Sequence, residues 1–510
     1  MNFSKIVSLE ALCALVDSLK KQGKKIVYAH GAFDLLHAGH IHHLEEAKKL
    51  GDILVATVTP DEFIQRGPGR PRFKEEERLR FLASLECVNF VALNDAPDVA
   101  ETVKKLRPDI YAKGEDVKHK VDDSAGGLYR EIAALGEIGG KVHFIKSLPI
   151  HSTELLNKYF SVYPKEVNEF LERFSRKYSL EMIAYALERI KKLKVLVIGD
   201  AIIDAYQYIS LISKSPKNNH IVAKRLDEEK FAGGIMACAN HIAGFCEDVA
   251  MVTCLGEQNS YESFIKEHLK GNIKPIFVYR SDGPTTLKRR FVEPTYMTKV
   301  FEVYDFNDSD LPVKETLETV ECLKNMISNY DLVLVADFGH GFLTDEIINL
   351  LCEKAKFLSL NVQTNSANYG FNFVTKYSRA DYVCINEPEI RLAMRRRTGE
   401  LDPLIEQISR ETRAERISIT GGHRGCMTFR KGEGFCRIPV LSTTVIDTVG
   451  AGDAFFSVSA PWAALGLPME LVGFIGNISG AIKVGTVCNK SSVGTEQLKD
   501  FIGHLLAGRN

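Results

Sequence analysis

Short runs of apolar residues alternate with amphipathic stretches along this chain, and the alternation starts afresh at two places. One series opens with an apolar run at residues 25–29, and the other opens with a run at residues 194–198. A polar or glycine-bearing turn follows each opening run, as His30-Gly31 and as Gly199-Asp200. β-branched runs separated by amphipathic helical stretches predict parallel strands connected by helices. We therefore expect two α/β domains, each built on a mostly parallel sheet.

Further strands are predicted where short apolar runs lie between turns. In the first series they are expected at residues 53–58, 89–93, 110–112 and 141–145. In the second series they are expected at residues 249–253, 332–336, 357–361, 382–385 and 416–420. A chain of 510 residues is also too long to fold around a single hydrophobic core, which agrees with more than one domain.

A helical stretch lies between the two series, from about Pro164 to Leu193. Its charged residues are spread among apolar ones such as Val167, Phe170 and Phe174, a spacing typical of an amphipathic helix. We predict a first domain over residues 1–160, a helical connector over 161–190 and a second domain over 191–510. The boundary is expected near residue 185, to within about ten residues.

Composition and charge restrict the classes of function. Hydrophobic residues make up 45% of the chain, and 65 Lys and Arg balance 66 Asp and Glu, so no overall charge favours nucleic acid or an anionic membrane. No segment has the length and freedom from charge of a membrane span. Near the start, Glu10 and Asp17 interrupt the apolar positions, which favours an amphipathic helix over a signal peptide. Eleven cysteines without a C-x-x-C pair indicate free thiols, and a cytoplasmic protein is expected.

A turn carrying two histidines follows the opening strand of the first domain. His37 and His40 lie three positions apart at the predicted start of a helix, and Gly39 lets a phosphate approach that start. Two imidazoles and a helix N-terminus can neutralise the β- and γ-phosphates of a nucleotide as they leave as pyrophosphate. From the residues alone, a pair of structural histidines or a metal site remains an alternative.

The segment from Gly31 to His40 resembles the G-x-F-D-x-x-H-x-G-H signature of the HxGH nucleotidyltransferases, and the likeness extends over about residues 20–160. Later segments match that family in order. They are Leu50-Gly51-Asp52, Arg70-Pro71 with Glu77-Arg78, Lys113-Gly114-Glu115-Asp116 and Ser152-Thr153. The resemblance implies a Rossmann-like nucleotidyltransferase domain in which His37, Gly39 and His40 hold the triphosphate. It also implies that Arg66 or Arg70 reaches the phosphates and that Ser152 and Thr153 close over the nucleotide. The remaining nucleotide-binding residues implied are Gly31, Phe33 and Lys113.

Two glycines and an aspartate near residue 450 predict a second phosphate-handling turn. Gly450 and Gly452 flank Ala451 and let the backbone approach a phosphoryl group, and a helix is expected to start after Asp453. Amide groups at such a start stabilise developing negative charge. Asp453 is placed to accept the proton of a hydroxyl, which fits transfer of a γ-phosphoryl group to an alcohol. A structural turn before a helix is the alternative.

Over about residues 190–505 the second domain resembles the ribokinase-like (PfkB-type) carbohydrate kinases. The matching segments are Gly199–Asp204, Ala232-Gly233-Gly234, Pro284–Phe291, Asn386–Glu389, Thr420–Gly425 and Asp447–Asp453. The resemblance implies a ribokinase-like doubly wound α/β domain with a small β lid and with Asp453 as catalytic base. It implies sugar binding by Asp204, Gly233, Gly234, Lys288 and Arg290. It also implies nucleotide or phosphate binding by Asn386, Glu389, Thr420, Gly422, Gly425, Gly450, Ala451 and Gly452, with Glu389 holding Mg²⁺ through water.

Three departures from the kinase pattern concern the substrate and nucleotide pockets. Ala237 stands where the sugar kinases usually carry Asn, and His340 stands where heptose kinases often carry Lys. The tract at residues 361–365 replaces a D-P-K-like stretch. The substrate is therefore the property that the resemblance defines least.

The two domains together resemble the bifunctional heptose kinase/nucleotidyltransferases that make ADP-heptose for lipopolysaccharide, here with the domain order reversed. The likeness implies ATP-dependent phosphorylation of a heptose 7-phosphate-like sugar at C1, and transfer of AMP from ATP to a sugar 1-phosphate. Mg²⁺, a nucleoside triphosphate and a sugar phosphate are the implied ligands, and a homodimer through the lid sheet is the implied assembly. The alternatives are CTP-dependent activation of another sugar or polyol, and a domain that serves only as a ligand-binding scaffold.

Overall fold

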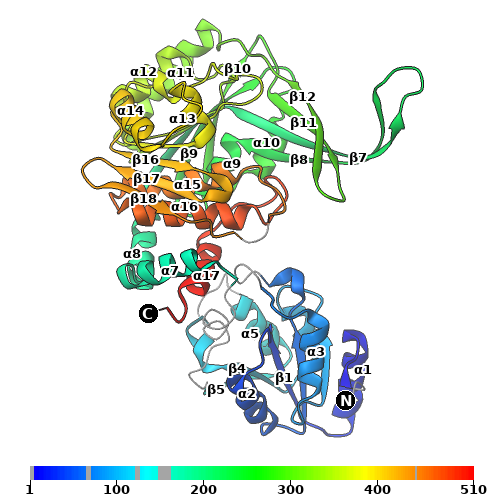
Figure 1. The fold of residues 1–510 in the computed structure, drawn as a ribbon. Coiled ribbons are helices and arrows are strands. Elements are labelled where there is room, and N and C mark those ends of the chain that lie inside the picture. The colour runs from blue at the N-terminus through cyan, green and yellow to red at the C-terminus, as the bar shows by residue number, and fades with distance from the viewer. Residues whose placement is uncertain (1–4, 65–69, 121–126, 147–161, 443–444, 510) are drawn as a thin grey trace. The chain divides into compact units, whose positions relative to one another are not determined.

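The fold consists of two compact units, each with its own sheet and its own buried core. The computed structural model describes residues 5–64, 70–120, 127–146, 162–442 and 445–509. Met1–Pro164 and His504–Asn510 form the first unit, and Lys165–Gly503 form the second (Figure 1). None of the helices in these ranges combines the length and apolar character that a membrane crossing requires.

The first unit is built on a parallel sheet of five strands in the order β3-β2-β1-β4-β5. The strands are β1 (Ile26–Gly31), β2 (Ile53–Val58), β3 (Phe90–Leu93), β4 (Ile110–Gly114) and β5 (Lys141–Ile145). The α-helices are α1 (Leu9–Lys21), α2 (Ala38–Lys48), α3 (Glu75–Ala83), α4 (Ala100–Leu106) and α5 (Gly127–Glu137). Short 3₁₀ turns are η2 (Asp61–Phe63) and η3 (Glu115–Lys120).

Helices cover both faces of this sheet because its strands are apolar on both sides. Leu44 of α2 and Leu82 of α3 share one buried cluster with Val27 of β1. On the other face, Leu12 of α1 and Val103 of α4 pack in a second cluster. Each such side chain contributes about 1.5–3 kcal/mol when it leaves water. The three-layer arrangement leaves only the ends of the strands open to a ligand.

The second unit is built on a sheet of nine strands in the order β10-β9-β6-β13-β14-β15-β16-β17-β18, in which all neighbours are parallel except the antiparallel pairs β16–β17 and β17–β18. The strands are β6 (Lys194–Gly199), β9 (Asp248–Gly256), β10 (Ile273–Arg280), β13 (Leu332–Asp337), β14 (Leu358–Val362), β15 (Tyr382–Asn386), β16 (Arg416–Thr420), β17 (Cys426–Arg430) and β18 (Gly434–Ile438). The α-helices are α7 (Lys165–Lys177), α8 (Leu180–Ile190), α9 (Ile235–Ile242), α10 (Glu262–His268), α11 (Val313–Met326), α12 (Asp345–Lys354), α13 (Glu387–Ala393), α14 (Asp402–Thr412), α15 (Ala451–Ala464) and α16 (Met469–Lys483). The last helix, α17 (Thr495–Leu506), begins in this unit, and its end from His504 onward is assigned to the first unit. The 3₁₀ turns are η4 (Ile327–Asn329), η5 (Val374–Lys376) and η6 (Gly422–Arg424).

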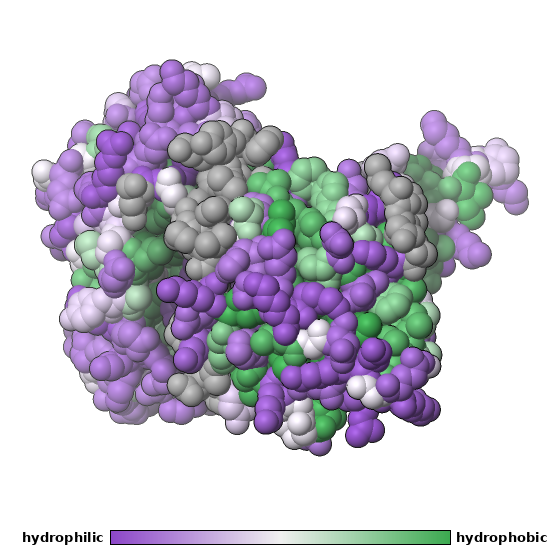
Figure 2. Space-filling model, turned by 90° about the horizontal axis from the view of Figure 1, so that it is seen from below, coloured by the Kyte–Doolittle hydropathy of each residue, from purple (hydrophilic) through white to green (hydrophobic). Residues whose placement is uncertain are grey.

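A smaller sheet of four strands in the order β12-β11-β7-β8 stands beside the large one in the second unit. Its strands are β7 (Ala201–Lys214), β8 (Ile221–Gly234), β11 (Thr286–Glu293) and β12 (Thr298–Asp305). The far end of the β7–β8 hairpin extends away from the rest of the unit as an arm (Figure 1). This arm exposes apolar side chains, among them Leu211, Ile212 and Ile221. Both hydrophobic and hydrophilic groups occur on the arm in Figure 2.

The helices expected as a connector over residues 161–190 are α7 and α8, and both belong to the second unit. Phe170 and Phe174 of α7 are buried against Phe474 of α16, with ring centroids 6.3 and 3.9 Å apart. Apolar packing of this kind fixes α7 to α16.

Candidate active sites

In the first unit the carboxyl ends of β1 and β4 define the candidate site. The chain runs from β1 to β2 and β3 on one side and returns to β4 on the other, so the strand order reverses between β1 and β4. Ligands of open α/β sheets bind in the crevice at such a reversal. The histidine turn follows β1, and Lys113 lies next to the last residue of β4. The sheet therefore brings both predicted segments to one edge.

His37 and His40 form a stacked pair at the start of α2. Their ring centroids are 4.1 Å apart, and His37 is the residue that caps the helix. Nδ1 of His37 accepts a hydrogen bond from the Gly39 amide at 3.0 Å, so in the neutral ring the proton lies on Nε2. Nδ1 of His40 donates to the Leu35 carbonyl at 3.1 Å. These backbone contacts through Nδ1 fix the positions of both rings at the start of α2.

Phe33 is a supporting residue in this structure. Its side chain is buried in the core, with its ring in an edge-on contact with His40 at 5.4 Å. A Cβ on Gly31 would lie 3.2 Å from the Phe33 ring, so the two positions fit each other closely. Direct nucleotide contacts by Phe33 and Gly31 stay predictions.

Arg70 is engaged by Asp34. The guanidinium lies 3.1 Å from the buried carboxylate, which also accepts the backbone amide of Phe73 at 3.0 Å. This arrangement anchors the loop before α3, and a phosphate contact by Arg70 stays a prediction. Neighbouring Arg78 is fully buried and donates to the carbonyls of Ala32 and Thr59, a structural role that sequence reasoning missed.

Lys113 also has a protein partner. Its ammonium lies 3.0 Å from Glu131 and 4.7 Å from the centre of the Tyr111 ring. The lysine is therefore oriented from β4 and α5 at the same sheet edge as the histidines. The predicted residues Arg66, Ser152 and Thr153 lie outside the residues that the structure describes.

In the second unit the candidate site lies where the strand order reverses between β6 and β13. α15 begins at Ala451, after Gly450 with φ of +80°, a conformation that suits glycine. A Cβ at Gly450 would lie 2.4 Å from Oδ1 of Asn489. The first turn of α15 thus presents the amides of Gly452 and Asp453, and early helix amides lack partners within the helix.

Asp453 is buried in that first turn and is held by a residue from a different strand. Nε2 of Gln363, which follows β14, donates to its Oδ1 at 2.7 Å and to Asn361 at 2.9 Å. Burial raises the pKa of Asp453 to about 6, against the opposing hydrogen bond from Gln363. The charge of Asp204 raises this pKa further, whereas Lys483 and Lys288 lower it. A carboxylate poised near neutral pH is suited to accepting a proton.

Asp204, Gly233 and Arg290 meet in the small sheet. Asp204 on β7 is ion-paired with Arg290 on β11, which also contacts Glu302 at 3.0 Å. A Cβ on Gly233 would lie 2.1 Å from Oδ2 of Asp204, so only glycine lets β8 approach this carboxylate. Gly234 follows and caps α9. Arg290 is thereby a partner of Asp204, and sugar contacts by this pair stay predictions.

Asn386 and Glu389 form a reciprocal capping box at the start of α13. The Glu389 carboxylate accepts the amide of Asn386 at 2.8 Å and that of Thr364 at 3.3 Å. Burial raises the pKa of Glu389 to about 7, partly offset by these backbone hydrogen bonds, and the charge of Asp453 adds to the rise. The structure thus brings the predicted N-x-x-E segment into electrostatic reach of Asp453.

The predicted nucleotide loop follows β16. Thr420 ends that strand, Gly422 begins η6, and the Gly421 amide donates to the Gly425 carbonyl at 2.8 Å. Arg424 of this turn pairs with Glu387 at the start of α13, at 2.5 Å. The loop and the capping box are therefore tied together at the ends of the neighbouring strands β15 and β16.

Ala237 on α9 lines a cavity of about 570 Å³ beside this site. The cavity wall also includes Asn489, whose amide donates to Asp204 at 3.5 Å. The small alanine leaves this side open where an asparagine would project into it.

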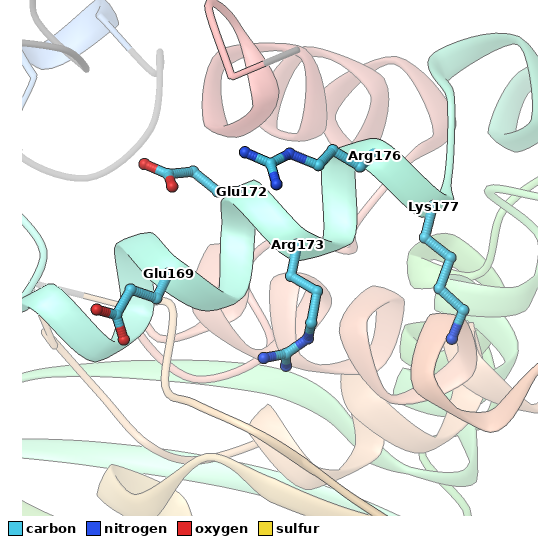
Figure 3. A pocket seen from close by; sticks show the side chains of 5 residues that line it. All are labelled: Glu169, Glu172, Arg173, Arg176 and Lys177. Carbon is cyan, nitrogen blue, oxygen red and sulfur yellow. The ribbon is translucent and has the colours of Figure 1, made fainter.

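A second hollow, of about 430 Å³, contains none of the predicted site residues. All of its lining side chains come from α7 (Figure 3). They are Glu169, Glu172, Arg173, Arg176 and Lys177. Both signs of charge occur along one helix face, which is typical of a solvated surface.

Gln363 is the main site residue that sequence reasoning missed. A signal existed, because the tract at residues 361–365 departs from the kinase pattern and follows a predicted strand. Asn489 was missed as well. It follows an irregular stretch without periodicity, so the sequence gives no indication that it reaches Asp204.

Comparison with protein families matches each unit separately. Residues 192–493 match the family described as pfkB family carbohydrate kinase, and residues 28–162 match the family described as cytidylyltransferase-like. Both matches agree with the two α/β folds, and the expected fold class is confirmed.

Individual relatives agree with these matches over shorter stretches. The Bifunctional protein HldE of Methylobacillus flagellatus is 40% identical over 151 residues, which are 29% of this chain and 30% of that protein. The Bifunctional protein HldE of Desulfatibacillum aliphaticivorans is 37% identical over 132 residues, 24% of this chain and 27% of that protein. The aligned parts therefore span less than a third of these relatives. The crystal structure of phosphofructokinase-2 from Escherichia coli with potassium is 13% identical, covers 61% of this chain and 99% of its own, and has a TM-score of 0.50, which supports the fold alone.

Proposed function

The chain belongs to the pfkB family of carbohydrate kinases, and from this premise we propose that it is a bifunctional enzyme of nucleotide-sugar synthesis. Residues 191–510 phosphorylate a heptose 7-phosphate-like sugar at C1 with ATP. Residues 1–160 transfer AMP from ATP to a sugar 1-phosphate and release pyrophosphate. The name Bifunctional protein HldE of the relatives supports a double activity, and the product class of the kinase is the substrate class of the transferase.

The observation that carries the kinase proposal is the position of Asp453. This buried carboxylate lies in the first turn of α15, oriented by Gln363 and within electrostatic reach of Asp204. The C1 hydroxyl attacks the γ-phosphorus, the bond to the β-phosphate oxygen breaks, and ADP leaves. Asp453 accepts the hydroxyl proton, while the amides at the start of α15 stabilise the charge on the transferred group.

Mg²⁺ fits the residues of the kinase site. Among the residues that the structure describes, no group of three or more His, Cys, Asp and Glu is arranged to hold a metal ion. Burial raises the pKa of both Glu389 and Asp453. The charge of Asp453 raises the pKa of Glu389 further, and the charge of Asp204 raises that of Asp453, so a nearby cation would stabilise the charged forms of both carboxylates. Glu389 would hold the ion through water. When bound, Mg²⁺ neutralises phosphate charge.

In the first unit the two histidines act at the triphosphate. His37 presents its Nε2 proton to a phosphate oxygen, and His40 beside it contributes a second imidazole at the start of α2. Attack of the sugar 1-phosphate on the α-phosphorus breaks the bond to the β-phosphate, and charge accumulates on the departing pyrophosphate. Fixed donors at this position stabilise that charge.

Phosphorus NMR of the full chain tests the proposal. With ATP, Mg²⁺ and heptose 7-phosphate, a new C1 phosphate signal is expected. With heptose 1-phosphate supplied directly, ATP is expected to yield pyrophosphate and CTP is not. A preference for CTP would favour the alternative nucleotide, which the cytidylyltransferase-like match also suggests. A complete lack of C1 phosphate would exclude heptose 7-phosphate as the substrate.

The pH dependence of the kinase follows from Asp453. The base must be deprotonated, and burial raises its pKa to about 6, so kcat/KM is expected to fall as the pH drops through 6. Gln363→Leu removes a hydrogen bond to the charged form and moves the midpoint upward. Because such a bond contributes about 1.5–3 kcal/mol, the midpoint is expected to rise by about 1–2 pH units. kcat/KM at pH 6 is then expected to fall roughly 7- to 80-fold, with a smaller change at pH 8. An unchanged midpoint in the variant would contradict the role of Gln363.

A homodimer through the arm of the second unit is part of the proposal. The exposed Leu211, Ile212 and Ile221 offer an apolar strand edge to a second copy of the chain. Light scattering is expected to give twice the mass of one 56.9 kDa chain.

A further inference from the structure

His340 is a buried side chain whose ring has no partner. It lies in the loop after β13 and is 3% exposed, and neither Nδ1 nor Nε2 makes a hydrogen bond within the described part of the chain. Its backbone, by contrast, is fixed, since the amide donates to Asp200 and the carbonyl accepts from Arg280, both at 3.4 Å. The ring packs edge-on against Phe306 at 5.4 Å. The loop therefore holds two unsatisfied nitrogen atoms in a defined place.

Lys288 is a second buried group without a polar partner. It lies on β11, is 5% exposed, and has no ion pair or hydrogen bond to its ammonium among the residues described. Its ammonium instead lies 5.1 Å from the centre of the Tyr304 ring. The neighbouring cations of the small sheet differ, because Arg289 pairs with Asp305 and Arg290 pairs with Asp204. Lys288 is the cation of β11 whose charge is left uncompensated at close range.

The two groups act on each other and on the kinase site. Burial, and then the charge of Lys288, lowers the pKa of His340 to about 3, so the ring is neutral. Burial lowers the pKa of Lys288, and the charge of Asp204 opposes this effect. The charge of Lys288 in turn lowers the pKa of Asp453. A neutral donor and a buried cation therefore lie together beside the residues proposed to bind and activate the sugar.

Buried polar groups without partners cost folding free energy, and in native proteins nearly all of them are satisfied. We propose that His340 and Lys288 together bind the phosphate group that the sugar substrate already carries, the ammonium compensating its charge and the imidazole N–H donating to an oxygen. A hydroxyl would leave Lys288 uncompensated. A neutral imidazole adds a donor without adding a second positive charge. The inference rests on the proposed kinase function and specifies which end of the sugar the lid side of the site recognises.

The test compares variants in binding and in turnover. His340→Phe removes both nitrogens at similar size, His340→Gln restores a donor, and Lys288→Met removes the charge. Arg289→Met is the matched control, because its side chain points to the opposite face of β11. Calorimetry without ATP measures binding of heptose 7-phosphate, and kinetics measure KM for this sugar and for unphosphorylated heptose.

For heptose 7-phosphate, Kd and KM are expected to rise roughly 10- to 100-fold in His340→Phe and Lys288→Met, with kcat within threefold of the parent and KM for ATP unchanged. His340→Gln is expected to recover part of the loss, and Arg289→Met to bind normally. The melting temperature of unliganded His340→Phe is expected not to fall, because its nitrogens had no partners to lose. A structural role would lower it.

Equal losses for phosphorylated and unphosphorylated heptose, or unchanged binding in His340→Phe, would overturn the inference. Calorimetry measures binding of the sugar phosphate even when no reaction takes place. A failure of this inference can therefore be told apart from a failure of the proposed kinase function, which is measured by turnover. If the parent does not bind heptose 7-phosphate, inorganic phosphate is the probe. Binding of inorganic phosphate that disappears in His340→Phe and Lys288→Met supports the site, and its absence in the parent rejects it.

Discussion

Replacing Asp453 by asparagine is expected to lower kcat for sugar phosphorylation by about 10²–10⁴, the usual contribution of a positioned general base. The substitution keeps the shape of the first turn of α15 and removes only the proton acceptor. Gln363 can still donate to the amide oxygen, so the local geometry is retained. Nucleotidyl transfer to a supplied sugar 1-phosphate, measured on the same preparation, is expected to continue at the parent rate.

Asp345→Asn is the matched control for this change. Asp345 is exposed in the first turn of α12, so its substitution removes one charge from a helix start without touching the site. Its kinase rate is expected to equal that of the parent. A kinase rate of Asp453→Asn within threefold of the parent would assign the proton to another acceptor, such as Asp204, whose charge acts on Asp453.

Most strands of the two large sheets could be predicted because they are short apolar runs that the fold buries, whereas β10, β17 and β18 were not expected. The run expected at residues 53–58 coincides with β2, and the run expected at 416–420 coincides with β16. A continuous apolar run indicates a buried strand, and the turn residues on either side of it mark where the strand begins and ends. The two helices that bear the phosphate-handling motifs were predicted because glycine or a capping residue precedes an apolar repeat. The expected start of the second was wrong by a few residues, since α15 begins at Ala451 and not after Asp453.

The small sheet was predicted only in part. The segment Pro284–Phe291, which resembles the lid strand of the kinases, overlaps β11, but β7 and β8 form the longest hairpin of the second unit and were not anticipated. β7 follows β6 after a single residue, Asp200, which looks like the end of a strand. Its outer half exposes Leu211 and Ile212. Strand prediction from apolar residues assumes that these residues face a core, and this assumption fails for the outer half of β7.

Partners of charged side chains could not be predicted at all. Arg70 was expected to reach a phosphate and Arg290 to bind the sugar, and the structure pairs them with Asp34 and Asp204. Gln363 reaches Asp453 across 90 positions of sequence. Such contacts depend on how loops from several strands pack together, and a local pattern contains no information about that packing.

The second large effect is expected in the first unit, where His37→Asn should lower nucleotidyl transfer by about 10²–10³, the typical loss when one donor at a developing charge is removed. Asparagine is chosen because His37 caps α2 through a hydrogen bond from the Gly39 amide, and Asn is among the best capping residues. The variant therefore removes the Nε2 donor and keeps the helix start. Its melting temperature is expected to stay close to that of the parent.

His42→Asn, farther along the same helix, is the matched control and is expected to release pyrophosphate at the parent rate. Kinase turnover of both variants, measured with heptose 7-phosphate, should be unchanged, because the kinase residues all belong to the second unit. If His37→Asn kept its transferase rate while folding normally, the stacked pair would be a structural feature of the turn. The triphosphate would then have to be held by the remaining amides of α2 and by residues such as Lys113.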